Sequence, residues 1–305
     1  MKKKKTVDRV KAYFVSPAGG RRIPYRLGSH LIWWFSGTKY ARETYFRRKV
    51  HLIETFLQET GIRQSSPELI REMINVFSLK KWRVMAVSHL SDRKFRKYVR
   101  FKNLDVFKKC YDSGKGVIIL SSHFGITEVA ISAFPRIGYT DFHTVVGALG
   151  ADSEKFTGIN PRIESKTLVF DNFSDAELFK LMMNAKRTLN DGGIIHLLGD
   201  GYHGKSGISF PFINKVRGFR PSYAELALST GASVLPIFIT LTDRHRVSFE
   251  LCNPLDPGND GMEREDRSRH MVSQYVDLLE RRWKEQPQYI NWGHMEKYLH
   301  HVSKL

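Results

Sequence analysis

The sequence has few cysteines and no long apolar run. Cys110 and Cys252 are its only cysteines, which excludes a disulfide framework and favours a reduced, intracellular setting. A membrane-spanning helix needs about 20 consecutive apolar residues, whereas the longest apolar runs here cover only residues 31–35 and 117–120. Lysines 2–5 resemble the start of a signal peptide, but the apolar stretch at 12–15 is too short to continue one. We therefore expect neither a membrane span nor a cleaved leader.

Acidic residues are scarce relative to basic ones. The chain has 49 Lys and Arg against 31 Asp and Glu, a formal net charge of +18. Residues 1–50 alone contain 14 basic and 2 acidic residues, so 14 − 2 = +12 of that charge lies there. An excess of this kind predicts an anionic partner, which is a nucleic acid, a membrane surface or an acidic protein.

Three aromatic residues within this basic region favour the membrane. Trp33, Trp34 and Phe35 lie among several arginines and lysines, and aromatic side chains beside basic ones are typical of segments that lie on an anionic bilayer. An ordinary buried helix with basic flanks is the alternative. Of the two, the charge favours a membrane-facing segment.

The remaining patterns predict an α/β domain behind a helical N-terminal region. Hydrophobic residues make up 41% of the chain, which is enough for a packed core. Helical periodicity is found at 37–58, after Ser66 and Pro67, and in a basic stretch at 80–109. Short strand-like runs at 116–121, 194–198, 234–241 and 247–251 alternate with helical patterns at 128–133, 175–190 and 221–230, and a last helix is expected at 264–284. We therefore expect a central, mainly parallel sheet flanked by helices, with residues 1–105 as a basic, membrane-facing helical region and residues 106–305 as the α/β domain, in one continuous unit.

A histidine follows the first of these strands. In open α/β sheets the reactive groups lie at the carboxyl ends of the strands, and His123 is in that position, with Glu128 five residues later. If Gly125 permits a tight turn, the Glu128 carboxylate can fix the tautomer of the imidazole and stabilise the imidazolium. Such a pair suits attack by a hydroxyl or amine on an activated carbonyl. A packed or capping histidine is the alternative.

The segment around His123 resembles a known signature. Residues 114–128 (Gly-Lys-Gly, an apolar run, then His-Phe-Gly and Glu) are similar to the first block of the lipid A biosynthesis (lauroyl/myristoyl) acyltransferases. Further similar blocks follow in the family's order, at 192–201, 210–212, 224–227, 230–238 and 287–292, and residues 42–54 are similar to its N-terminal helix. Ile126 and Thr127 replace the family's usual Asn-Trp, and its N-terminal transmembrane helix is missing. The chain thus resembles a divergent member.

The resemblance implies a fold like that of the lysophospholipid and glycerolipid acyltransferases. It also implies transfer of a fatty acyl group from a carrier-protein or CoA thioester to a hydroxyl or amine of a lipid or carrier-bound acceptor. Neither a metal nor a redox cofactor is implied. The expected site of action is the cytoplasmic face of the bacterial inner membrane, with peripheral attachment. His123 is then the general base and Glu128 its orienting partner.

The same resemblance implies further site residues. The family has an Arg between its first two blocks, for which Arg162 is the candidate and Lys166 a rival. Asp200 matches the family's Asp after the second strand, although an Asp between two glycines also initiates turns. Three basic residues are candidates for binding phosphates of the acceptor or of a phosphopantetheine arm, with plain surface exposure as the alternative: Lys205, Arg217 and Arg220.

Two other classes of protein remain as alternatives. The high pI of about 9.9 is compatible with a nucleic-acid-binding protein without enzymatic activity. However, the sequence has no zinc-ligand spacing or ribonucleoprotein-type motif. Ser121 and Ser122 adjoin His123, but the Gly-x-Ser-x-Gly elbow of serine hydrolases is missing.

Overall fold

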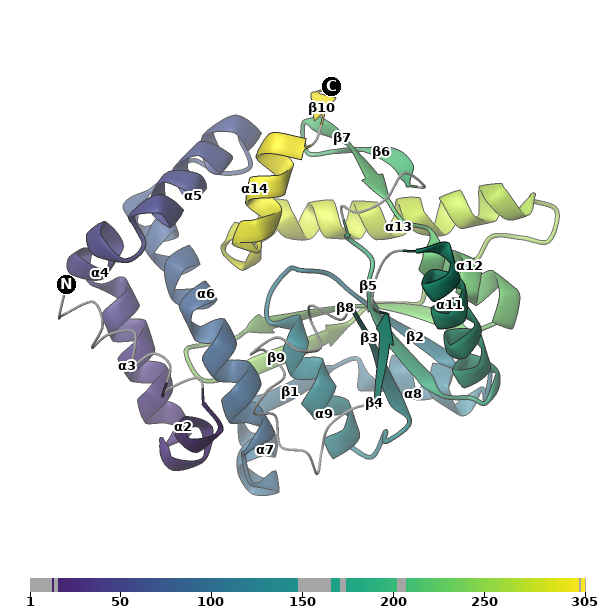
Figure 1. The fold of residues 1–305 in the computed structure, drawn as a ribbon, viewed down its shortest axis with the longest axis horizontal. Coiled ribbons are helices and arrows are strands. Elements are labelled where there is room, and N and C mark those ends of the chain that lie inside the picture. Colours follow the sequence, from purple (N-terminus) through teal and green to yellow (C-terminus); the bar gives the residue numbers. More distant parts are fainter. Residues whose placement is uncertain are drawn as a thin grey trace.

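The computed structural model describes residues 13, 16–147, 166–170, 174–201, 207–301 and 303–304 (Figure 1). Helices dominate the N-terminal third and the C-terminus, and a twisted sheet lies between them. In the described part of the first 112 residues the helices are α2 (Pro17–Arg22), α3 (Tyr25–Gly37), α4 (Lys39–Thr44), α5 (Arg47–Thr60), α6 (Pro67–Ser88), α7 (Asp92–Tyr98) and α8 (Leu104–Asp112). Those of the remainder are η1 (Thr127–Val129), α9 (Ala130–Arg136), α11 (Asp175–Asn190), α12 (Ser222–Thr230), α13 (Arg264–Glu285), η3 (Pro287–Tyr289) and α14 (Trp292–His301).

The main sheet has seven strands in the order β1-β9-β8-β2-β5-β3-β4. They are β1 (Val99–Lys102), β2 (Val117–Ser121), β3 (Phe142–Gly147), β4 (Lys166–Phe170), β5 (Ile194–Leu198), β8 (Ser233–Leu241) and β9 (Val247–Leu251). Every neighbouring pair is parallel except β8 and β9, which form an antiparallel pair. A second, antiparallel sheet in the order β10-β7-β6 contains β6 (Ile208–Phe212), β7 (Lys215–Phe219) and β10 (Ser303–Lys304). The α/β class with a mainly parallel sheet and a helical N-terminal region is therefore confirmed.

Both faces of the main sheet are buried. All five residues of β2 are buried, and they divide by alternation, because successive side chains of a strand point to opposite faces. Ile118 and Leu120 belong to a core shared with α5, α11, α12, α13 and α14. Val117 and Ile119 belong to a second core shared with α3, α7, α8 and α9. A continuous apolar run is what a strand covered on both faces requires.

The N-terminal helices are tied to the sheet through α6. Helix α3 lies against α6 (Figure 1), and a Cβ on Gly28 of α3 would lie only 2.3 Å from the Trp82 ring of α6. A residue without a side chain is therefore needed at this crossing. Arg83 of α6 is buried and donates to the Tyr25 hydroxyl and to the His245 carbonyl, which joins α3 and α6 to the loop between β8 and β9.

Local signals placed most of these elements correctly. Helix α6 begins at Pro67, and the Ser66 hydroxyl accepts a hydrogen bond from the backbone N–H of Leu69, as the N-cap pattern predicts. The helix expected at 37–58 is two helices, because the chain leaves the helical path at Tyr45 and Phe46 between α4 and α5. The basic stretch at 80–109 is wrong as one helical region, since it contains β1, which pairs with β9.

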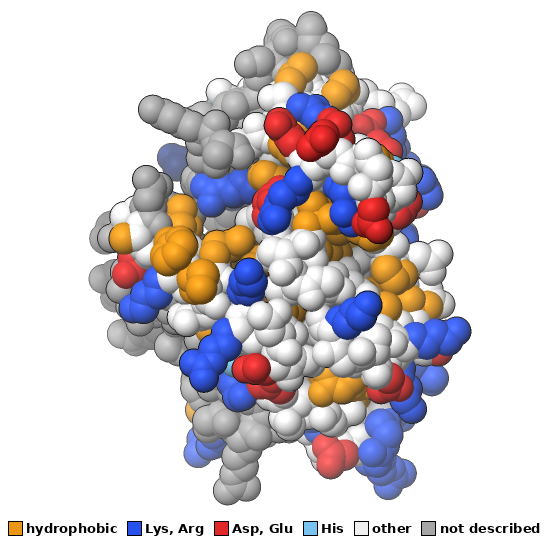
Figure 2. All heavy atoms as spheres, turned by 90° about the vertical axis from the view of Figure 1, so that its right-hand side faces the viewer, with side chains coloured by type: hydrophobic (Ala, Val, Ile, Leu, Met, Phe, Trp, Pro, Cys, Tyr) orange, Lys and Arg blue, Asp and Glu red, His pale blue; other side chains and the backbone are white. Residues whose placement is uncertain are grey.

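Two structural features relate to the expected charge distribution and membrane association: the side chains on the surface, and the length and hydropathy of the helices. Figure 2 shows the face on the right of Figure 1, where Lys and Arg side chains are spread over the surface with acidic side chains between them. On this face the basic side chains are dispersed. Among the residues described, no helix has the length and hydropathy needed to cross a membrane.

Candidate active site

His123 lies in a tight segment just beyond the carboxyl end of β2. The chain turns at Gly125, whose φ of +77° is in the left-handed region. A Cβ there would lie 2.0 Å from the Ile239 carbonyl oxygen of β8, so only glycine permits this approach. The backbone is fixed on both sides, because Gly125 donates to the Tyr289 carbonyl and Ile126 to the Ile239 carbonyl. The His123 side chain remains 35% exposed and thus accessible to a substrate.

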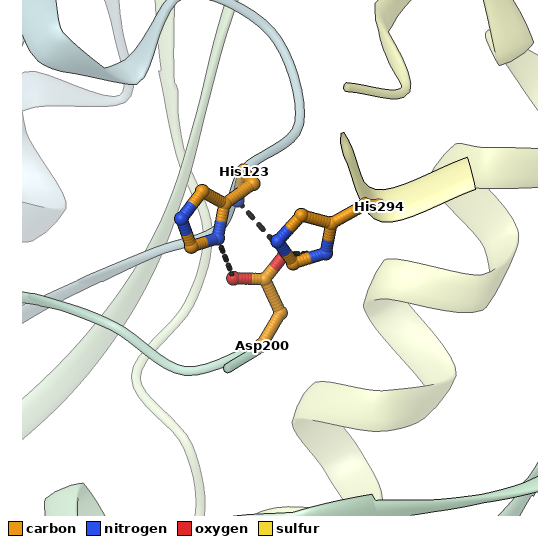
Figure 3. Close-up of side chains that lie close together, drawn as sticks. All are labelled: His123, Asp200 and His294. Carbon is orange, nitrogen blue, oxygen red and sulfur yellow. Dashed lines mark hydrogen bonds and ion pairs between the residues drawn. The ribbon is translucent and has the colours of Figure 1, made fainter. Parts of the chain in front are cut away.

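Asp200 holds the His123 imidazole. Its Oδ1 lies 2.8 Å from His123 Nδ1, and its Oδ2 accepts the backbone N–H of His123 at 2.8 Å (Figure 3). The register of the parallel pair β2–β5 explains this contact. Ser121 is opposite Leu198, and His123 and Asp200 each follow two residues later, at the same edge of the sheet.

The Asp200 carboxylate is ionised although it is only 1% exposed. Burial by itself would raise its pKa, but the neighbouring His123, His294 and Arg217 outweigh burial and hold the pKa of this carboxyl well below its usual value. A carboxylate in this state can stabilise positive charge on His123. It also favours the imidazole tautomer that carries its proton on Nδ1 and leaves Nε2 as the base.

His294 is a third member of the cluster. Its ring stacks on the His123 ring, with 4.1 Å between the centroids and 26° between the planes, and its Nδ1 lies 3.5 Å from Asp200 Oδ2 (Figure 3). Burial, above all, holds the pKa of His294 well below its usual value, against the opposing charge of Asp200. His294 was not among the residues predicted from the sequence. A sequence signal lay nearby, because residues 287–292 resemble a family motif that ends two positions before His294.

These three side chains are also of the types that bind metals. Their ligand atoms lie within 4.8 Å of one another, which makes them a candidate cation cluster among the residues described. Both Asp200 oxygens, however, already receive hydrogen bonds from His123. We therefore interpret the cluster as a hydrogen-bonded unit.

Glu128 has a different partner from the one expected. We expected the Glu128 carboxylate to contact the His123 imidazole, but the carboxylate that contacts His123 Nδ1 is that of Asp200. Glu128 lies in η1, and its Oε1 is 3.0 Å from the Nζ of Lys80 on α6. Lys80 was not identified from the sequence. It also lines a small hollow together with Gly125 and residues 288–291.

The basic residues predicted to belong to the site differ in their positions. Arg217 of β7 is 1% exposed, its guanidinium lies 4.5 Å from the Phe219 ring centroid, and its Nη2 donates to the backbone carbonyl of Asp200. It therefore supports the loop that carries Asp200. The phosphate-binding role predicted for it stays a prediction, and the alternative of plain surface exposure is wrong. Arg220 is half-buried beyond the end of β7, and burial lowers its pKa. Arg162 and Lys205 lie outside the described residues.

Lys166, the rival of Arg162, is far from the reactive edge. It begins β4 and pairs with His143 at the amino end of the parallel β3–β4 pair, where its Nζ lies 2.6 Å from Asp141 Oδ1. His123 and Asp200 lie beyond the carboxyl ends of their strands. Since parallel strands place these two ends at opposite edges, Lys166 is wrong as a candidate for the oxyanion.

Ser121 is engaged in a buried contact beneath the site. Its hydroxyl lies 2.9 Å from His196 Nε2, and both side chains are buried. Burial lowers the pKa of His196 to about 4. A hydroxyl in this position is inaccessible to a substrate, so the geometry disfavours the serine-hydrolase alternative.

Comparison with known proteins identifies the family that the sequence matches. The family model of the bacterial lipid A biosynthesis acyltransferases matches residues 60–287, which is more than half of the chain. No curated protein matches the sequence. The matched range includes α6, the sheet, His123 and Asp200, and it ends before His294.

Proposed function

Since the chain belongs to the bacterial lipid A biosynthesis acyltransferase family, we propose that it transfers an acyl group from a carrier-protein or CoA thioester to a hydroxyl or amine of a lipid or carrier-bound acceptor. Family membership itself indicates acyl transfer in lipid biosynthesis. The donor, the acceptor group and the residue roles are the proposed part. The 2.8 Å contact between His123 Nδ1 and Asp200 is the observation that carries the residue roles, and the donor and acceptor classes follow from the family.

The chemistry requires one base and one stabilised charge. His123 Nε2 takes the proton from the acceptor O–H or N–H while the acceptor atom attacks the thioester carbonyl. Asp200 stabilises the resulting imidazolium. The C–S bond of the tetrahedral intermediate then breaks, and the imidazolium returns its proton to the departing thiolate. General-base catalysis of this kind contributes about 10²–10⁴ to the rate.

The remaining charged residues have supporting roles within this proposal. Glu128 and Lys80 hold η1 against α6 and thereby fix the turn that follows His123. Arg162 serves the oxyanion of the tetrahedral intermediate, because a positioned cation stabilises the charge that develops there. Lys205 and Arg220 bind phosphate groups of the acceptor or of the donor's phosphopantetheine arm.

The place of action within this proposal is the cytoplasmic face of the bacterial inner membrane, with α3 as the contact. Leu27, Leu31 and Trp34 are 50%, 42% and 66% exposed, and their spacing of four and three residues places them on one face of the helix. Trp33 lies near Arg244, with 5.6 Å between the guanidinium carbon and the ring centroid. The arginines at 21, 22 and 26, which come shortly before this face in the chain, are exposed. Exposed apolar side chains with basic neighbours suit an anionic bilayer.

Thiol release tests the proposed reaction. Purified protein is mixed with myristoyl-CoA or a myristoyl carrier protein and with vesicles made from a bacterial lipid extract, and free thiol and acylated lipid are measured together. We expect lipid-dependent thiol release by the wild type and none by His123→Ala. Equal rates for the two proteins, with no acylated product, would overturn the proposal.

Nucleic-acid binding is tested in parallel by titrating duplex DNA at increasing salt concentration. If the basic charge serves a bilayer, binding is weak at physiological salt and independent of the DNA sequence. Tight duplex binding under those conditions, together with inactivity in the thiol assay, would favour the nucleic-acid alternative.

A further inference from the structure

We propose that His294 is a positioning residue, whose neutral imidazole holds the Asp200 carboxylate and stacks on His123 so that the base is kept in one orientation. This inference rests on the proposed function. It concerns a residue outside the range that the family model matches. It predicts effects on His123 that are measurable without any substrate.

The geometry gives His294 contact with both partners. The carboxylate of Asp200 receives the backbone N–H and Nδ1 of His123 on its two oxygens, and His294 Nδ1 lies 3.5 Å from Oδ2. The stacked rings, 4.1 Å apart, restrict rotation of the His123 side chain. His294 thus limits the movement of the base and of the acid that orients it.

The helix that carries His294 is firmly anchored. Lys215, buried in β7, donates to the carbonyls of Tyr298 and Leu299 in α14, at 2.9 Å and 3.2 Å. The Tyr298 hydroxyl donates to the Phe212 carbonyl of β6 at 3.0 Å. A side chain on such a support can impose a position on its neighbours.

Neutrality is necessary for this role. A protonated His294 would compete with His123 for the single negative charge of Asp200. The groups that face His294 are Asp200 and His123 at the sheet edge, Arg217 from β7 and Lys297 on its own helix. Burial and these three cationic or basic groups disfavour the charged form, so the Asp200 charge remains available to His123.

Two variants separate the contact with Asp200 from the stack. His294→Phe keeps a stacked ring and removes the nitrogen beside Asp200, whereas His294→Asn keeps a hydrogen-bond donor and removes the ring. His300→Phe is the matched control, because His300 lies exposed on the same helix.

The first measurement is an NMR titration of the His123 ring in the free protein, with its signal assigned by its loss in His123→Ala. His294→Phe removes the polar Nδ1 group beside Asp200, so we expect the titration midpoint of His123 to rise by about 0.5–1 unit relative to the wild type, which corresponds to about 0.7–1.4 kcal/mol. His294→Asn should recover most of this shift, and His300→Phe should show none. An unchanged titration in His294→Phe would overturn the positioning role.

The second measurement is steady-state acyl transfer. We expect kcat to fall about tenfold in His294→Phe with KM unchanged, and partial recovery in His294→Asn. A rise in KM alone would show that His294 contacts the substrate instead, and would also overturn the inference. If no variant and no wild type transfers acyl groups, the proposed function fails, while the NMR result still decides the role of His294.

A titration with Zn²⁺ completes the test. Because the Asp200 oxygens are already hydrogen-bonded, we expect no saturable binding of Zn²⁺ at micromolar concentration to the wild-type cluster. Binding that disappears in His294→Phe would reassign the three side chains as a metal site.

Discussion

Replacing Asp200 by asparagine removes the charge beside His123 while keeping the size of the side chain. In the proposed reaction His123 becomes an imidazolium, and its charge lies about 4 Å from that of the carboxylate. At an effective dielectric constant of about 20 this attraction is worth about 4 kcal/mol as an upper bound. Asparagine can also donate a hydrogen bond to Nδ1 and thereby favour the wrong tautomer, which in serine proteases costs about 10⁴ in kcat.

We therefore expect Asp200→Asn to lower kcat by about 10³, because 1.36 kcal/mol corresponds to a factor of ten. KM should change little, since the carboxylate is buried behind the imidazole. The assay is thiol release from the acyl thioester with saturating lipid vesicles, and unfolding by urea shows whether the variant is folded.

Glu128→Gln is the matched control for this variant. It alters the ion pair with Lys80 and leaves the His123–Asp200 bond in place. We expect a decrease of about tenfold or less, the effect of weakening one charged hydrogen bond by about 1.4 kcal/mol. If Glu128→Gln abolishes transfer while Asp200→Asn retains most of it, Glu128 is the orienting carboxylate and the reasoning from this geometry is refuted.

Three further predictions concern the fold, the membrane and pH. Gly125→Ala should destabilise the protein by about 2 kcal/mol or more, since it combines strain at positive φ with a clash against the Ile239 carbonyl. Gly61→Ala, at a similar φ in open space, should destabilise it less. Equal urea midpoints for the two variants would contradict this prediction. Leu31→Ser with Trp34→Ser should weaken sedimentation with phosphatidylglycerol vesicles at least about tenfold, whereas unchanged binding would reject α3 as the contact. His196, buried with a pKa of about 4, must accept a proton on unfolding below its unfolded pKa of about 6.5, so stability falls as pH falls through this window, by about 3 kcal/mol at pH 4. In urea unfolding, His196→Gln should flatten the pH dependence of stability, whereas the exposed His51→Gln should leave it unchanged. Identical slopes of stability against pH for the wild type and His196→Gln would exclude protonation of His196 as the cause.

Local sequence signals predicted those helices and strands whose boundaries are set by residues adjacent in the chain. Helix α6 begins where Ser66 and Pro67 predict it, and α11 spans the residues expected from its periodicity. The strands that lie within the centre of the sheet, β2, β5 and β8, were visible because strands buried on both faces must be continuously apolar.

Three short strands away from the centre of the sheet were not visible in this way. β1, β3 and β4 have mixed sequences of four to six residues. Their pairing depends on partners far away in the chain, and no local pattern marks them. Similarly, the break between α4 and α5 is marked by neither proline nor glycine.

The sequence by itself identified the family signature and the class of fold, and it predicted His123 as the candidate base. It also identified Asp200, but not its contact with the imidazole. Only the tertiary structure decided which carboxylate contacts the His123 imidazole, because the register of β2 and β5 brings together two residues 77 positions apart. It also brought His294 from the C-terminal helix onto the same carboxylate and turned Glu128 towards Lys80. The physical reason is that spacing along the chain limits what neighbours can do, whereas contacts between distant residues are fixed by how the strands pair and how the helices pack on them.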